Sequence, residues 1–179
     1  MSRSNDLGFT LTELLISVAI ISLLTGVMLA MIARTRTAAQ SVNCLSRLHH
    51  IGASFSQYAS DNDGLFPDPT ELQQSWEKCL HPYLSDPAAF QCPADEEVFT
   101  AVGSSYDWRD TGKPATTLAG RPLRDVNRDD VVLAFESLPG WHTRHSMNAA
   151  LIDGSARAMD EESCLSDLQT PVRYLPVVR

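Results

Sequence analysis

The pattern of apolar and polar positions divides the chain into two unequal parts. Twenty consecutive residues, Leu14 to Ala33, contain no charged side chain and no proline, and their one glycine is Gly26. A stretch of about 18 or more apolar residues is long enough to cross a bilayer as a helix. The N-terminal part of the chain therefore predicts a membrane-spanning helix.

A different pattern follows in the next part of the chain. Apolar side chains recur there at steps of three and four residues: Cys44, Leu45, Leu48, Ile51, Phe55 and Tyr58. This spacing is typical of an amphipathic helix with one buried face. Because no proline occurs between Phe9 and Pro67, we expect the spanning helix to continue into the amphipathic one. Cap and turn residues at 60–64 predict where this helix ends.

From Leu65 onward, short apolar runs alternate with prolines and turn residues. Val131–Phe135 is predicted to be a strand, because it is short and rich in β-branched side chains. Met147–Ile152 and Ser155–Met159 flank Asp153-Gly154, and Asp-Gly between two apolar segments is a strong hairpin signal. These segments predict a small antiparallel sheet.

Two other segments complete the prediction. Trp76–Leu84 is expected to form a short helix, and Gly103–Asp130 is expected to be a loop because it has few apolar residues. The predicted fold class is α+β, with a long N-terminal helix whose first half spans a membrane. The second half of that helix packs on a small C-terminal antiparallel β-sheet domain.

Charge and motif content limit the classes of function. The 179 residues include 14 Lys or Arg and 22 Asp or Glu, which gives a net charge of −8. An acidic surface disfavours nucleic acid, because basic side chains that neutralise phosphates supply most of that affinity. The sequence contains no H-E-x-x-H or G-x-S-x-G pattern, and its five histidines are expected to be solvated or to cap helices. We therefore expect no enzymatic activity and no nucleic-acid partner.

Glu13 stands at the very start of the apolar stretch. A lone carboxylate in hydrocarbon costs about 2.5–3.5 kcal/mol or more, so this side chain needs a partner. A secretory signal peptide does not fit, because the apolar core is too long and no A-x-A-like cleavage site follows it. A plain signal anchor fits the length of the stretch but leaves Glu13 unexplained.

The segment Gly8-Phe9-Thr10-Leu11-Thr12-Glu13-Leu14-Leu15 resembles the processing site of type IV pilins and type II secretion pseudopilins. The resemblance implies that prepilin peptidase cleaves between Gly8 and Phe9 and then N-methylates Phe9. It also implies that Glu13 serves assembly by pairing with the methylated amine of Phe9 in a neighbouring subunit. The implied regions are a leader (1–8), a transmembrane and assembly helix (9–33), its amphipathic continuation (34–62) and a globular pilin-like β domain (63–179).

The same resemblance implies a structural subunit of a type IV pilus-like or type II secretion pseudopilus filament. Its implied partners are other pilin copies, prepilin peptidase/methyltransferase, the inner-membrane assembly machinery and, before assembly, membrane lipid. The implied location is the bacterial inner membrane, crossed once, with the globular domain extracytoplasmic (periplasmic) or in a filament. One alternative is a minor or tip pilin acting as an extracytoplasmic binding or adhesion module, with recognition by the loop Gly103–Asp130. The other is a tethered hydrolase, for which the sequence offers no nucleophile–base signature.

Several stretches of the globular part are similar to a large pseudopilin-like group found in planctomycetes and verrucomicrobia. They are Cys44–Gly52, Tyr58–Pro67, the Cys-Pro-x-Asp stretch within Phe90–Asp95, and Ser105-Tyr106. Members of this group often end in an H-x9-DG signature. Here seven residues separate His145 from Asp153-Gly154, so the signature is two residues short.

Four cysteines permit three pairings, and disulfides form in extracytoplasmic domains. Cys79 and Cys92 are separated by twelve residues and are candidates for a disulfide that closes a small loop. Cys44 lies on the apolar stripe of the predicted helix, where an unpaired cysteine packs as a small hydrophobic side chain. No C-x2-C pair is present, which disfavours a zinc knuckle.

One segment has the spacing of a calcium-binding loop. Asp125, Asn127 and Asp129 alternate, and Glu136 stands at the twelfth position. The sixth position is Asp130, where the sharp turn of such a loop needs glycine. We therefore expect neither a cofactor nor a metal, with calcium at Asp125, Asn127 and Asp129 as the weaker alternative.

Overall fold

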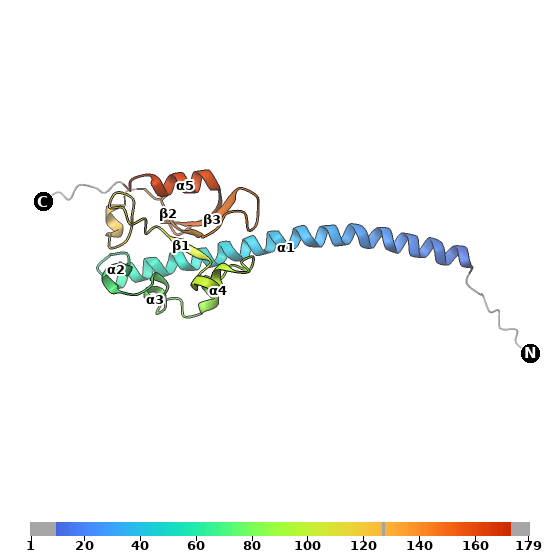
Figure 1. The fold of residues 1–179 in the computed structure, drawn as a ribbon, viewed down its shortest axis with the longest axis horizontal. Coiled ribbons are helices and arrows are strands. Elements are labelled where there is room, and N and C mark those ends of the chain that lie inside the picture. Colours follow the sequence, from blue (N-terminus) through green and yellow to red (C-terminus); the bar gives the residue numbers. More distant parts are fainter. Residues whose placement is uncertain (1–9, 127, 173–179) are drawn as a thin grey trace, which may run out of the picture. The chain divides into compact units, whose positions relative to one another are not determined.

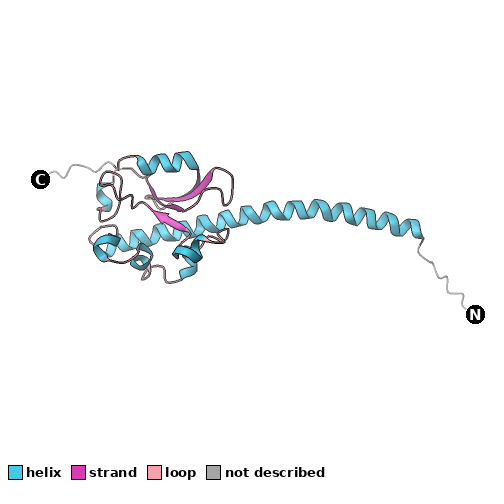
Figure 2. Cartoon of the chain, in the orientation of Figure 1, coloured by secondary structure: helices cyan, strands magenta, loops and turns pink. Residues whose placement is uncertain are grey.

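The structure is a computed structural model of the chain, and it describes residues 10–126 and 128–172. Its helices and strands are shown in Figures 1 and 2. In chain order they are α1 (Leu11–Asp61), α2 (Pro69–Leu72), α3 (Trp76–Leu80), the 3-10 helix η1 (Pro87–Phe90), α4 (Val98–Val102), β1 (Tyr106–Trp108), the 3-10 helix η2 (Leu123–Asp125), β2 (Val132–Glu136), β3 (Ser146–Leu151), β4 (Ala156–Asp160) and α5 (Glu161–Gln169). The expected α+β class, with one long N-terminal helix and a small antiparallel sheet, is confirmed.

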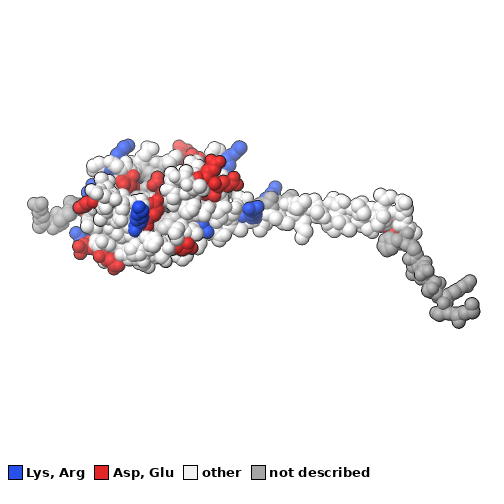
Figure 3. All heavy atoms as spheres, turned by 60° about the horizontal axis from the view of Figure 1, so that its bottom comes forward, with Lys and Arg blue, Asp and Glu red and all other residues white. Residues whose placement is uncertain are grey.

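The chain divides into two compact units, Met1–Ala38 and Ala39–Arg179. In the first unit, the described apolar side chains of α1 are exposed, for example Leu14 at 60% and Leu24 at 64%. By length and composition, α1 contains a stretch able to cross a membrane, and none of that stretch is buried. Figure 3 shows this part of the helix as a run of atoms without acidic or basic side chains. A helix that is apolar all round needs lipid or other helices around it.

The second unit contains the amphipathic part of α1. Cys44, Leu48, Ile51 and Phe55 are each fully buried, at the three- and four-residue steps expected from the sequence. These side chains form one core cluster with the sheet residues Tyr106, Trp108, Leu133, Ala134 and Ala150. The amphipathic prediction is confirmed, and Phe55 stacks on Trp108 with ring centroids 5.0 Å apart.

α1 ends at Asp61, within the predicted group of cap and turn residues. The next turn closes on the helix, because the Gly64 N–H donates to the Ala59 carbonyl at 2.7 Å. Gly64 has φ +78°, a left-handed conformation that glycine adopts without steric cost.

The sheet is an antiparallel meander in the order β1-β2-β3-β4. The predicted strand corresponds to β2, displaced by one residue, and the predicted hairpin is β3–β4. Gly154, at φ +84°, lies in the hairpin turn, where Asp153 Oδ1 accepts a hydrogen bond from Ser155 N at 2.8 Å. The prediction that Gly103–Asp130 is entirely loop was wrong, since it contains β1 and η2. β1 has three residues, too few for alternation to show in a sequence.

The two faces of the sheet have different covers, and Figure 1 shows α5 and the second part of α1 on opposite sides of it. On the α5 face, Met147, Ala149 and Leu151 of β3 pack with Val132 and Cys164. The alternate residue of β3, Ala150, packs in the α1 cluster. The register shifts between Val132 and Ala134, so that both Leu133 and Ala134 belong to the α1 cluster. The sequence analysis did not predict α5.

A buried guanidinium attaches α5 and the residues after it to the sheet. Arg109 is fully buried, and its Nη1 donates to Asp167 Oδ2 at 2.6 Å. Its Nη2 donates to the carbonyl oxygens of Asp167 and Thr170, both at 2.7 Å. Asp167 also accepts from Arg128 Nη2 at 3.0 Å and from Val132 N at 2.9 Å. Both carboxylate oxygens of Asp167 therefore accept hydrogen bonds, as a charged group removed from water requires.

Candidate functional site

Two places in the described residues carry chemistry of interest, and the first is the beginning of α1. Thr10 N and Thr10 Oγ1 both donate to Glu13 Oε2, at 3.0 and 2.7 Å. Glu13 N in turn donates to Thr10 Oγ1 at 3.3 Å. This reciprocal pair is a capping box, in which a threonine and a glutamate three residues later satisfy the free N–H groups of a helix start. The sequence analysis missed it, although Thr10-Leu11-Thr12-Glu13 has the S/T-x-x-E signature.

The capping box determines what Glu13 offers to a partner. Within residues 10–126 and 128–172, the hydrogen bonds of its carboxylate both end on Oε2. The Glu13 side chain is exposed. Thr10 therefore holds it through one of its two carboxylate oxygens. Gly8 and Phe9, the predicted cleavage residues, lie outside the described residues.

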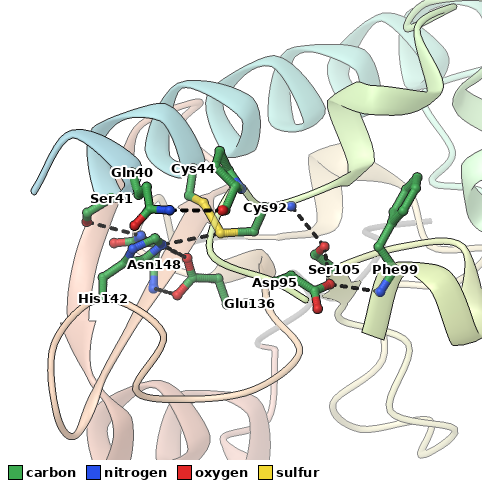
Figure 4. Close-up of a disulfide and its surroundings, with 11 residues drawn as sticks. Gln40, Ser41, Cys44, Cys92, Asp95, Phe99, Ser105, Glu136, His142 and Asn148 are labelled. Atoms are coloured by element: carbon green, nitrogen blue, oxygen red, sulfur yellow. Dashed lines mark hydrogen bonds and ion pairs between the residues drawn. A yellow bond between two sulfur atoms is a disulfide. The ribbon is translucent and has the colours of Figure 1, made fainter. Parts of the chain in front are cut away.

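The second place surrounds a disulfide between Cys44 and Cys92 (Figure 4), with Cα atoms 5.4 Å apart. The predicted Cys79–Cys92 pairing was wrong, because Cys79 is a free, buried thiol in α3. A separation of twelve residues in the sequence does not determine the distance between the two cysteines in the folded chain. Cys92 follows η1 and meets the buried face of α1, where Cys44 lies. Among the described cysteines, Cys164 is also free and buried, and burial raises the pKa of its thiol to about 11.

Hydrogen bonds hold the Cys92 segment in place independently of the disulfide. Cys92 N donates to Ser105 Oγ at 2.8 Å, and Ser105 Oγ donates to Asp95 Oδ2. Asp95 also accepts from the N–H groups of residues 97, 98 and 99, between 2.8 and 2.9 Å, at the start of α4. The Cys-Pro-x-Asp and Ser-Tyr stretches thus form one unit.

Asp95 is largely buried, and two opposite influences act on its carboxyl group. Burial alone would raise the pKa of Asp95, but the hydrogen bonds from Ser105 and the α4 backbone outweigh it, so that the pKa lies below its ordinary value. The carboxylate is therefore the stable form at neutral pH and can accept all four hydrogen bonds.

A buried polar group lies beside the disulfide, formed by Glu136, His142 and Asn148 (Figure 4). Asn148 N and Nδ2 donate to the two oxygens of Glu136, each at 2.9 Å. His142 Nε2 lies 3.1 Å from Glu136 Oε1 and 3.3 Å from Cys92 Sγ. Burial raises the pKa of Glu136 to about 7, although the Asn148 hydrogen bonds oppose this, and burial lowers the pKa of His142. Burial thus favours the uncharged form of both groups.

The expectation that all histidines are solvated or cap helices was wrong for His142, whose side chain is 3% exposed. No local pattern identifies it, because the loop that carries it is irregular and largely exposed. His145, the residue at the shortened signature, is exposed and has φ +59°. Its carbonyl accepts from Glu161 N at 3.0 Å, and its Nδ1 lies 3.6 Å from Glu161 Oε2. It therefore connects the β2–β3 loop to the start of α5.

The structure describes only part of the possible calcium loop. Asp125 ends η2, and the Asp129 carbonyl accepts from Asp153 N, while Asn127 lies outside the described residues. Glu136, at the twelfth position of the calcium-loop spacing, lies in β2 and accepts hydrogen bonds from Asn148. Among residues 10–126 and 128–172, one group of side chains has metal-ligating atoms close together, and it consists of Cys44, Cys92, Glu136 and His142.

Comparison with known proteins identifies the N-terminal segment. Residues 3–29 match the family model described as the prokaryotic N-terminal methylation motif. No curated protein and no solved structure matches the chain. Proteins with this motif are structural rather than enzymatic, and the motif marks a substrate of prepilin peptidase. The motif and the long apolar helix indicate a single-pass, membrane-anchored protein. Together with the α+β arrangement of a long helix and a four-stranded antiparallel sheet, they support a type IV pilin-like or pseudopilin-like protein.

Proposed function

We propose that this chain is a structural subunit of a type IV pilus-like or type II secretion pseudopilus filament. Prepilin peptidase cleaves it between Gly8 and Phe9 and methylates the new amino terminus, and the mature helix then joins other pilin helices. The observation that carries this proposal is the exposed apolar surface of α1 in the first unit, with one carboxylate, Glu13, in its first turn.

The exposed apolar surface of α1 must be covered first by the membrane and later by neighbouring helices. Each exposed Leu or Ile side chain gains about 1.5–3 kcal/mol when it is fully removed from water. The membrane supplies that environment before assembly, and neighbouring helices supply it in the filament. Leaving lipid for a filament gives little hydrophobic gain, because lipid tails are as apolar as leucine. A polar contact is therefore needed to favour assembly and to set the register.

Glu13 is suited to make that contact. The capping box with Thr10 uses only its Oε2 among the described residues, and the amine of Phe9 in a neighbouring subunit carries the complementary charge. A charge pair that leaves water together compensates the desolvation that each member would otherwise bear alone. The helices then stagger until amine and carboxylate meet.

Substitutions at Glu13 separate the charge from the helix cap. Glu13→Gln keeps a capping-box side chain but removes the charge, whereas Glu13→Ala removes both. We expect both variants to be processed and inserted in the membrane but absent from sheared filaments, measured by immunoblot. Thr10→Val is the matched control, since it disturbs the cap and keeps the charge, and it should still assemble. Normal assembly of Glu13→Gln together with failure of Glu13→Ala would show that Glu13 acts only as a cap.

Processing is tested at the cleavage residues themselves. Mass spectrometry of the mature protein should give a chain that begins at Phe9 and carries one methyl group on its amine. Gly8→Val should leave full-length precursor in the membrane, because a branched side chain obstructs the approach of the peptidase to the backbone. A mature protein that retains its first eight residues would refute the proposal.

We further propose that residues 39–179 lie outside the cytoplasm. The Cys44–Cys92 disulfide supports this, because disulfides persist in oxidising compartments and are rare in the cytosol. Protease added to intact spheroplasts should digest this unit, and a cytosolic marker protein should survive the same treatment. The number of copies per filament distinguishes a main subunit, found along the fibre, from the alternative of a tip subunit that acts in binding or adhesion.

A further inference from the structure

Four side chains with metal-ligating atoms meet at one buried point of the second unit (Figure 4). Cys44 comes from α1, Cys92 from the turn after η1, Glu136 from β2, and His142 from the loop between β2 and β3. One ligand atom from each residue can be chosen so that all four lie within 4.8 Å of one another. Both cysteines are fully buried, and Glu136 is 1% exposed.

These four donors are the kinds of atom that Zn²⁺ prefers. Zinc binds thiolate sulfur at about 2.3 Å, imidazole nitrogen at about 2.0–2.1 Å and carboxylate oxygen at about 2.0–2.2 Å, in a tetrahedron. Donor atoms at the corners of such a tetrahedron lie about 3.3–3.8 Å apart. The imidazole Nε2 of His142 is already 3.3 Å from Cys92 Sγ and 3.1 Å from Glu136 Oε1.

While Cys44 Sγ and Cys92 Sγ are bonded to each other, they lie too close together to occupy two corners of that tetrahedron. We propose that, when the Cys44–Cys92 disulfide is reduced or has not yet formed, these four residues bind one Zn²⁺ ion. The disulfide links two of these four segments, and the metal links all four. This inference concerns the second unit alone and does not depend on filament assembly.

Exchange of the disulfide for the metal begins with reduction. A dithiol reductant transfers two electrons and two protons to the cystine, the Sγ–Sγ bond breaks, two thiols form, and the dithiol becomes a disulfide. Zn²⁺ then binds both sulfurs as thiolates and Glu136 as a carboxylate, which releases two protons from the thiols and one more from Glu136 where its carboxyl is protonated. In reverse, a disulfide oxidant takes two electrons from the thiolates and two protons from solvent and becomes a dithiol, the Sγ–Sγ bond forms, and Zn²⁺ leaves. With a neutral imidazole and an ionised carboxylate, the metal-bound cluster carries a net charge of −1.

The surrounding hydrogen bonds keep the donors in place without the disulfide. Asn148 donates to both oxygens of Glu136 and fixes their orientation, as hydrogen-bond partners of metal-binding side chains do. Ser105 holds the backbone of Cys92, and Gln40 Nε2 donates to the Pro93 carbonyl at 3.0 Å. The donors on α1 and β2 belong to regular elements, whereas His142 comes from a loop with exposed residues on either side.

The test uses the full-length protein in detergent, with Cys79→Ala and Cys164→Ala so that the cluster holds the remaining thiols. The protein is reduced with a dithiol, desalted under nitrogen and titrated with Zn²⁺ against a chromophoric chelator. We expect one Zn²⁺ per reduced chain and none per oxidised chain. His142→Ala should weaken Zn²⁺ binding at least about 10-fold, because losing even a hydrogen-bond partner of a metal ligand typically costs that much. His145→Ala, an exposed histidine three residues away, should leave binding unchanged.

A second measurement covers the case in which the reduced protein unfolds without metal. Tryptophan emission reports folding of the second unit, and Zn²⁺ should then restore the native emission of the reduced protein, as it does in small zinc domains. Co²⁺ should give the absorption of a tetrahedral thiolate site in the same sample. Three results would each overturn the proposal: no Zn²⁺ bound by the reduced chain, equal binding by the oxidised chain, or equal binding by His142→Ala and His145→Ala.

Discussion

Cys44 and Cys92 join positions 48 residues apart, and this separation sets how strongly their disulfide stabilises the second unit. A cross-link confines the unfolded chain, and for a loop of about 50 residues the lost entropy is worth about 4 kcal/mol at 25 °C. Replacing both cysteines by alanine removes the cross-link and little apolar surface, because the two residue types are similar in size. We therefore expect the free energy of unfolding to fall by about 4 kcal/mol, which corresponds to a Tm lower by roughly 8–16 °C.

The assay is urea unfolding of the full-length protein in detergent, followed by tryptophan emission. All three tryptophans of the chain, Trp76, Trp108 and Trp141, lie within the second unit, so the signal does not report the membrane helix. The matched control replaces the free buried cysteines Cys79 and Cys164 by alanine, which makes the same chemical change without removing a cross-link. If the two double variants lose the same free energy within about 1 kcal/mol, the reasoning from loop closure is refuted.

Three further predictions use the same unfolding assay. Asp167→Ala should destabilise the second unit by about 3–5 kcal/mol, because it leaves the buried charge of Arg109 without its partner; Glu162→Ala, exposed on the same helix, should cost little. Asp95 has a lowered pKa in the folded state, so its stabilising contribution is present above its unfolded pKa, near 3.9, and is lost as the pH falls through the folded value. The difference in urea midpoint between wild type and Asp95→Asn should therefore shrink from pH 7 to pH 3, and a constant difference would contradict this explanation. Gly154→Ala should cost about 1–2 kcal/mol, because alanine resists the φ of +84° in the hairpin turn.

Local sequence patterns were sufficient to predict the elements with strong periodicity or a specific turn. The apolar stretch from Leu14 and the stripe from Cys44 to Tyr58 both lie in α1, and Asp153-Gly154 forms the turn of the predicted hairpin. The spacing of Thr10 and Glu13 also matches the capping-box signature, so this helix start is encoded locally. β1 and α5 were missed because one is very short and the other has few apolar residues.

The polar cluster beside the disulfide could not be predicted in the same way. The stripe on α1 places Cys44 on a buried face, but it does not say which distant segment covers that face. Cys92 meets it through a turn after a 3-10 helix, and Glu136 and His142 arrive from a strand and an exposed loop. Such a meeting depends on tertiary packing, which periodicity and residue spacing do not encode.

The disulfide also changes how the chain would respond to tension. Cys44 lies near the beginning of the second unit, so a pull on α1 passes through the covalent bond to Cys92 and bypasses the residues between them. Those 48 peptide steps, roughly 160 Å of extended chain, are excluded from any stretching until the bond is broken. Pulled by its ends, the oxidised chain is therefore shorter at full extension than the reduced one, and α2, α3 and η1 bear no force.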